Sequence, residues 1–148
     1  MSNREAALAI AKKMRDAYNA RDGKGVGACY SKDATSWDVN FDGVARGRDA
    51  IAAAVDMYCF AFHESRFETL ELFTDGKMIC EQWMSYGVHR GELLGIAPTG
   101  VNIAVGGCNV MHIGSDGLIE REAIIWDAAR MYRQLGVWPA APEPEFLR

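Results

Sequence analysis

The chain has 148 residues, and its 20 acidic and 16 basic residues give a net charge of −4 at pH 7 and a pI near 5.4. Its composition, 49% hydrophobic and 24% charged, is that of an ordinary soluble globular domain. Basic residues do not cluster beyond Lys12 and Lys13, which argues against nucleic acid and membranes as partners.

No apolar run approaches the roughly 18 residues of a transmembrane helix, and the first residues lack the order of a secretory signal. We therefore expect a cytoplasmic location. The four cysteines are widely spaced and form no CxxC pair, which is typical of reduced, buried thiols. We expect neither disulfides nor a metal site from Cys29, Cys59, Cys80 and Cys108.

The first part of the chain predicts helices. Residues 3–19 form an amphipathic pattern in which Ala7, Ala11, Met14 and Tyr18 share one face. Residues 22–30 contain three glycines and predict a weak helix or an irregular turn, and residues 34–39 predict a short strand. After a loop at 43–47, a second apolar helix is expected at 48–62, with one buried face made by Ile51, Val55, Tyr58 and Phe62.

The second part predicts a sheet. Asp75-Gly76 and Asp116-Gly117 are typical hairpin turns, and four segments rich in strand-forming residues surround them: 66–74, 77–88, 101–113 and 118–126. Helices followed by antiparallel strands predict an α+β domain with a curved sheet and helices on one face. A last helix is expected at 128–135. We expect one domain over residues 1–136 and an extended, Pro-rich tail over 137–148.

Asp127 lies between the last predicted strand and the last predicted helix. It is either the N-cap of that helix or a working acid/base group. Strand alternation gives Asp127 the same face as Ile125 and Ala123, and the opposite face to Trp126 and Ile124.

Four segments in this order resemble the SnoaL-like polyketide cyclases of the nuclear-transport-factor-2-like superfamily: GRDAI (47–51), HRGELLGIAPTG (89–100), DGLIE (116–120) and IWDAARMYRQLG (125–136). The resemblance implies a cystatin-like α+β barrel: a mainly antiparallel sheet wrapped into a cone, closed by the N-terminal helices around a central hydrophobic pocket. It also implies that Asp127 is the general acid/base. Epoxide-hydrolase-like relatives carry an Arg and an Asp two residues apart where this chain reads CEQWMSYG, so epoxide hydrolysis is less favoured.

Asp38 is a second candidate for proton transfer. Ketosteroid isomerases of the same superfamily have their proton-shuttling aspartate in a context that resembles DATSWD at 33–38. Two registers are open: Asp38 points into the pocket and Trp37 away, or Trp37 lines the pocket and Asp38 is solvated. His89 is a third candidate, as a hydrogen-bond donor to a developing enolate.

The resemblance further implies a pocket wall made of core side chains. We expect Asn109 to be a polar group in this wall, on the face of its strand that also carries Val105. The substrate-binding residues that we expect are Tyr18, Trp37, Tyr58, Phe62, Trp83, Val105, Asn109 and Ile125.

The function implied by this resemblance is cofactor-free acid/base chemistry on a polyketide-like or polycyclic ketone, with intramolecular aldol cyclisation as the leading reaction. Such a reaction needs no metal, because the conjugated carbonyls of the substrate delocalise the carbanion. The alternatives are an isomerase or hydrolase that uses the same pocket, or a non-catalytic small-molecule-binding domain.

The predicted outer face of the sheet is too apolar to be exposed to water. We place Ile124 and Trp126 on it, with Val110, Cys108 and Ala104 of the neighbouring strand. This pattern predicts a homodimer through the sheet.

Overall fold

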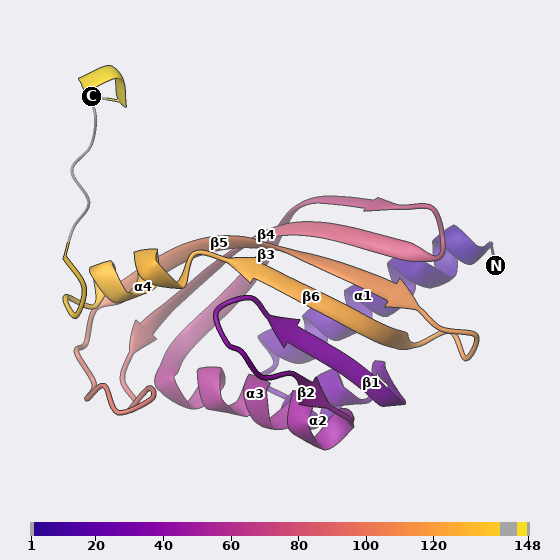
Figure 1. Cartoon of the computed structure of the whole chain (residues 1–148), viewed down its shortest axis with the longest axis horizontal. Coiled ribbons are helices and arrows are strands. Elements are labelled where there is room, and N and C mark those ends of the chain that lie inside the picture. Colours follow the sequence, from indigo (N-terminus) through magenta and orange to yellow (C-terminus); the bar gives the residue numbers. More distant parts are fainter. Residues whose placement is uncertain (1, 140–144, 148) are drawn as a thin grey trace.

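A computed structural model describes residues 2–139 and 145–147. In Figure 1, a curved sheet crosses the molecule, helices α1 to α3 lie along one side of it, and α4 follows the last strand at one end. The elements are α1 (Asn3–Asn19), α2 (Gly23–Gly27), β1 (Tyr30–Asp38), β2 (Ala45–Arg46), α3 (Arg48–Ala61), β3 (Phe62–Thr74), β4 (Met78–His89), β5 (Asn102–Ile113), β6 (Ile119–Trp126), α4 (Ala128–Gln134) and the short 3-10 helix η1 (Glu145–Leu147).

Helix α1 has the bounds that its periodicity predicts. Ser2 begins it with a capping box, since the Ser2 hydroxyl accepts from the backbone N–H of Glu5 and the Glu5 carboxylate accepts from the Ser2 N–H. Ala7, Ala11 and Met14 are buried on one stripe, as predicted. This stripe packs into a core with α2, α3 and the inner face of the sheet.

The six strands form one open sheet in the order β2-β1-β6-β5-β4-β3. All neighbours are antiparallel except β1 and β6, which run parallel. The fold class expected from the sequence is confirmed, although the sheet does not close into a barrel. Three local predictions were wrong. β1 and β3 each begin four residues earlier than expected, at Tyr30 and Phe62, and the segment expected to be a loop contains β2.

The prediction for the two faces of β6 was wrong. Glu122 is 3% exposed and lies on the concave, helix-covered face with Ile124 and Trp126, whereas Ile125 is 50% exposed on the outer face. Both alternating rows of this strand contain apolar residues, so the period of two alone could not identify the buried row. Pairing with β1 fixes the register and sets Ile124 beside Asp38.

Residues 140–144, which include two of the prolines of the predicted tail, lie outside the described part of the chain. The division into a domain of residues 1–136 and a tail of residues 137–148 stays a prediction. Within residues 2–139 and 145–147, no helix is both long and apolar enough to cross a membrane.

Candidate functional site

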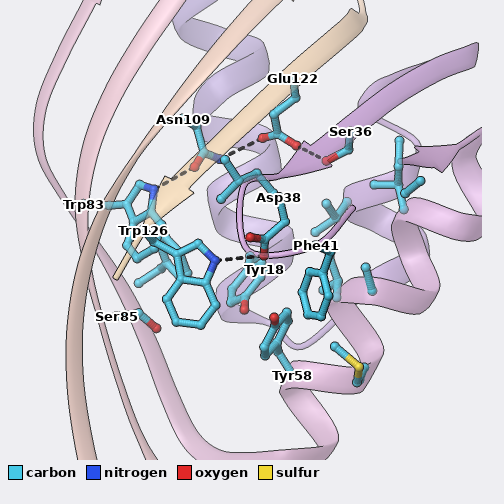
Figure 2. Close-up of a pocket in the computed structure, with 18 of the residues that line it drawn as sticks. Tyr18, Ser36, Asp38, Phe41, Tyr58, Trp83, Ser85, Asn109, Glu122 and Trp126 are labelled. Atoms are coloured by element: carbon cyan, nitrogen blue, oxygen red, sulfur yellow. Dashed lines mark hydrogen bonds between the residues drawn. The ribbon is translucent and has the colours of Figure 1, made fainter. Parts of the chain in front are cut away.

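The concave face of the sheet and helices α1 to α3 enclose a cavity of about 540 Å³. Its wall is mostly apolar, with contributions from Ile51, Val55, Ile103 and Met131. Polar side chains enter this wall at a few points, and ligand-binding cavities typically combine an apolar wall with a few such groups. The close-up of the cavity in Figure 2 labels most of these polar side chains.

Asp38, the last residue of β1, points into the cavity (Figure 2). The indole Nε1–H of Trp126 donates a hydrogen bond of 2.8 Å to its Oδ2. Its Oδ1 accepts two more from Asn40, one from the backbone N–H at 2.9 Å and one from the side-chain amide at 3.0 Å. A carboxylate that accepts several hydrogen bonds is held in one orientation, so Asp38 presents an oriented carboxylate to an apolar cavity.

A glycine in β5 leaves room for the side chains of Trp83 and Trp126 on the two strands beside it. Gly107 lies between Trp83 and Trp126 in the sheet register. A Cβ atom on Gly107 would lie 2.5 Å from the Trp83 ring and 2.7 Å from the Cβ of Trp126. The Trp83 ring and the Cβ of Trp126 therefore occupy space that a side chain here would fill. The Trp126 ring also packs edge-on against Tyr58 of α3, with 6.0 Å between the ring centroids.

Another carboxyl group, Glu122, lies deeper in the wall and belongs to a hydrogen-bond network across four strands, β1, β4, β5 and β6. Its Oε1 accepts from the Asn109 amide at 2.7 Å. Its Oε2 accepts from the hydroxyls of Tyr30 and Ser36, each at 2.8 Å. The Trp83 indole N–H in turn donates to Asn109 Oδ1 at 2.8 Å. These bonds orient every member of the network. Figure 2 shows the bonds that join Trp83, Asn109, Glu122 and Ser36.

Burial raises the pKa of Glu122 above its ordinary value of 4.5. The hydrogen bonds from Tyr30, Ser36 and Asn109 oppose this effect, as does the positive charge of Arg15, but burial is the larger cause. Burial also raises the pKa of Tyr30 well above its ordinary value, so this phenol keeps its proton and stays a hydrogen-bond donor.

Arg15 adds a buried ion pair beside the network. Its guanidinium contacts Glu81 of β4 twice, from Nη2 at 2.5 Å and from Nε at 3.1 Å, and it lies over the Phe67 ring at 4.1 Å. The Thr69 hydroxyl donates to the same carboxylate at 2.6 Å. The two charges neutralise each other, so Arg15 acts on Glu122 as part of a pair and not as a free cation.

Several predicted site residues do line the cavity. Asp38 points inward, so the first of the two registers considered for β1 is correct. Asn109 and Val105 share the inner face of β5, as expected. Six of the predicted substrate-binding residues line the wall: Tyr18, Tyr58, Phe62, Trp83, Val105 and Asn109.

Four predicted residues lie outside the cavity: Trp37, Ile125, Asp127 and His89. Trp37 is 44% exposed on the outer face, because its neighbour Asp38 takes the inward position. Ile125 is on the outer face because its neighbours Ile124 and Trp126 take the inward positions. Asp127 has a side chain 54% exposed; it caps α4 by accepting from the Arg130 N–H at 2.8 Å and lies 3.6 Å from the Arg133 guanidinium. The cap interpretation of Asp127 is therefore correct, and the prediction that its face lines the pocket was wrong.

His89 is fully buried, but it lies under the loop that follows β4 and not in the cavity wall. The Thr99 N–H donates to its Nδ1 at 3.2 Å, and the Thr99 hydroxyl lies 3.0 Å from the same atom. Nδ1 is therefore an acceptor, and the ring proton is on Nε2. In this geometry His89 holds the PTG loop and does not contact a ligand in the cavity.

Sequence reasoning missed Glu122, Ser36 and Tyr30. Strand alternation placed Glu122 on the same face as Ile124 and Trp126, which was expected to be the outer face of the sheet. The available signal was for Ser36: strand alternation gives it the same face of β1 as Asp38, so an inward Asp38 implies an inward Ser36. No cluster of three or more His, Cys, Asp or Glu side chains that could hold a metal ion occurs in the described residues.

Comparisons with known proteins agree with this architecture. A family model for SnoaL-like polyketide cyclases matches residues 8–135. Aklanonic acid methyl ester cyclase DnrD of Streptomyces peucetius is 34% identical over 96 residues, an alignment that spans 64% of this chain and 66%, just under two thirds, of that protein.

Solved structures share the fold. TsrD of Streptomyces laurentii superposes with a TM-score of 0.82 at 22% identity, covering 93% of this chain and 99% of the other. A protein of Catenulispora acidiphila with a ketosteroid isomerase-like fold gives a TM-score of 0.75 at 15% identity, covering 91% and 97%. The chain belongs to the SnoaL-like polyketide cyclase family.

Proposed function

We propose that this protein is a polyketide cyclase that closes a ring in a polyketide-like or polycyclic ketone by cofactor-free aldol chemistry. The family match and the similarity to a cyclase support the reaction class. The apolar cavity of about 540 Å³ supports a hydrophobic substrate of drug-like size. The observation that carries the proposal is the oriented carboxylate of Asp38 inside this cavity.

In the proposed reaction Asp38 removes a proton from the carbon next to a substrate carbonyl. The C–H bond breaks, an O–H bond forms on Asp38, and the electron pair moves onto the carbonyl oxygen. The resulting enolate carbon attacks a second carbonyl carbon of the same molecule and forms the new C–C bond. The alkoxide that results takes the proton back from Asp38, so the carboxylate is regenerated and no cofactor is consumed.

The test is Asp38→Asn, which keeps the size of the side chain and removes the base. The substrate would be aklanonic acid methyl ester, named for the reaction of the relative, together with other aromatic polyketide ketones. General base catalysis typically contributes 10² to 10⁴ in rate, so we expect kcat to fall by about that factor. Wild-type turnover that survives the substitution unchanged would contradict the proposal.

Asp127→Asn is the matched control. Asn is as good an N-cap as Asp, so the helix is kept while the carboxylate is lost. We expect near wild-type turnover, since Asp127 lies outside the cavity and contacts Arg130 and Arg133. A large loss in this variant would instead favour Asp127, the residue implied by the family resemblance, as the acid/base group.

A second candidate is an isomerase that moves a proton between two carbons of one ketone, because the same oriented Asp38 could deliver the proton to a new position. A β,γ-unsaturated steroid ketone distinguishes the two: an isomerase converts it to the conjugated isomer, which absorbs in the ultraviolet. If the protein binds these ketones and converts none of them, a non-catalytic binding role replaces both.

We also propose that two copies associate through the outer faces of their sheets. Directly paired residues share a face, and one apolar row crosses five strands, from Phe73 through Cys80, Val110 and Ala123 to Trp37. Phe73 is 63% exposed, at the far end of the row from the exposed Trp37. Light scattering should give the mass of a dimer for wild type and of a monomer for Phe73→Glu. Phe60→Glu is the control, since Phe60 is equally exposed but lies on α3.

A further inference from the structure

Three acidic residues line the cavity. Asp42 is exposed in the loop after β1, whereas Asp38 and Glu122 are part of the wall and have different surroundings. Asp38 and Ser36 both point inward from β1, two residues apart, and Ser36 pairs directly with Glu122 of β6. Two strand residues span about 7 Å, so one bound ketone can reach both Asp38 and Ser36. A base thus lies at one point of the wall and a hydroxyl linked to a buried acid lies at another.

The hydrogen bonds around Glu122 determine which of its oxygens carries a proton. The Trp83 indole can only donate, so it fixes Asn109 with its oxygen toward Trp83 and its amide group toward Glu122. Oε1 of Glu122 must therefore accept. The proton of the neutral acid belongs on Oε2, whose neighbours are the hydroxyls of Tyr30 and Ser36.

A hydroxyl accepts as readily as it donates. When Glu122 is protonated, its Oε2–H donates to Ser36 Oγ, and the Ser36 hydroxyl is free to turn its own proton into the cavity. Tyr30 keeps an alternative acceptor, since its hydroxyl also lies 3.4 Å from the Met14 sulfur. The neutral form of the network is thus satisfied without moving a side chain.

We propose that Ser36 and Glu122 form the hydrogen-bond donor that receives the carbonyl oxygen of the substrate while Asp38 removes the proton from the adjacent carbon. This inference rests on the proposed cyclase function. Ser36 is then the catalytic residue, because it contacts the substrate oxygen. Glu122 acts through Ser36 and is a positioning residue. Its protonated carboxyl group donates to Ser36 Oγ, so the Ser36 hydroxyl can donate to the substrate.

Burial makes the neutral form of Glu122 easier to populate than in an exposed glutamate. Burial raises the pKa of Glu122, and the groups of the described structure that face it are Tyr30 and Ser36 of β1, Asn109 of β5 and, at longer range, Arg15 of α1. The charge of Arg15 is balanced by Glu81. The donor exists while Glu122 is protonated, so catalysis should be lost as pH rises through this raised pKa.

The sharpest test compares Glu122→Gln with Ser36→Ala and wild type. A glutamine copies the protonated acid: its oxygen accepts from Asn109 and its amide donates to Ser36. We expect kcat of Glu122→Gln within about threefold of wild type at neutral pH, with no loss on the alkaline side. Ser36→Ala should lower kcat by about 10² to 10³, the usual effect of deleting an oxyanion donor, with KM little changed. Glu120→Gln, at an exposed residue of the same strand, is the control and should keep the wild-type pH profile.

A readout that needs no turnover tests the protonation directly. Infrared difference spectra between wild type and Glu122→Gln should contain the C=O stretch of a protonated carboxyl group at neutral pH. An unchanged kcat in Ser36→Ala, or an alkaline loss that persists in Glu122→Gln, would overturn the inference. If Asp38→Asn abolishes turnover while Ser36→Ala does not affect it, this inference alone fails; if Asp38→Asn has no effect, the proposed function itself fails.

Discussion

Two aspartates end two neighbouring strands of the same sheet, and they have opposite surroundings. Asp38 closes β1 and points into an apolar cavity, where it accepts from Trp126 and Asn40. Asp127 follows β6, faces solvent and caps α4. Trp126 separates them: it precedes Asp127 in the chain and turns its indole toward Asp38.

This contrast shows that a carboxylate at a strand end acquires its role from the neighbours that it meets. Asp127 satisfies the free N–H groups at the start of a helix, a function that water or another capping residue could partly replace. Asp38 is held by donors in a cavity that a substrate can occupy. The same residue type thus serves folding at one strand end and, in our proposal, chemistry at the other.

Loss of the Trp126 indole N–H should have the largest effect on kcat among three variants: Trp126→Phe, Asp127→Ala and Asn40→Ala. Trp126→Phe deletes the indole N–H that orients Asp38 and leaves Asp127 in place. A hydrogen bond to a charged group contributes about 1.5 to 3 kcal/mol. Its loss should lower kcat on a polyketide ketone roughly tenfold to hundredfold. Trp37→Phe, on the outer face of β1, is the control. Equal kcat in wild type and Trp126→Phe would mean that Asp38 needs no such orientation.

Removing the cap should change stability and leave the chemistry intact. Asp127→Ala loses the bond to the Arg130 N–H, so we expect the free energy of unfolding to fall by about 1 kcal/mol. Urea unfolding measures this change, and Asp127→Asn should restore most of it. A fall in kcat in Asp127→Ala at a temperature where the protein is fully folded would contradict the separation of the two roles.

Much of this fold could be predicted because its signals are local. The apolar stripe of α1, the two Asp-Gly turns and the helix-forming residues after Trp126 each act over a few residues, and the elements that they predict are confirmed. The position of Asp38 was open between two registers, since a short strand with a polar end carries no decisive alternation. Pairing of β1 with β6, which are distant in sequence, decides it.

The deep part of the site could not be predicted for the same reason. Glu122 is buried because Tyr30, Ser36 and Asn109 supply its hydrogen bonds, and these residues come from two other strands. A charged residue is normally solvated, so its burial follows only from long-range partners that the sequence does not reveal. The two faces of β6 were assigned wrongly for the same reason: Ile125 was expected to line the pocket, but it is exposed on the outer face.

The smallest fall in kcat that we predict follows from the loss of the Asn40 side chain, the second side chain that donates to Asp38. Asn40→Ala removes the side-chain amide that lies 3.0 Å from Asp38 Oδ1 and 3.2 Å from the Trp126 carbonyl oxygen, but it keeps the backbone N–H that donates to the same Oδ1. Loss of one of two donors to one oxygen should cost about 0.5 to 1 kcal/mol, a twofold to fivefold fall in kcat. Asn102→Ala, at the exposed start of β5, should have no such effect. A fall as large as that of Trp126→Phe would mean that the loop after β1, and not the indole, holds the base in position.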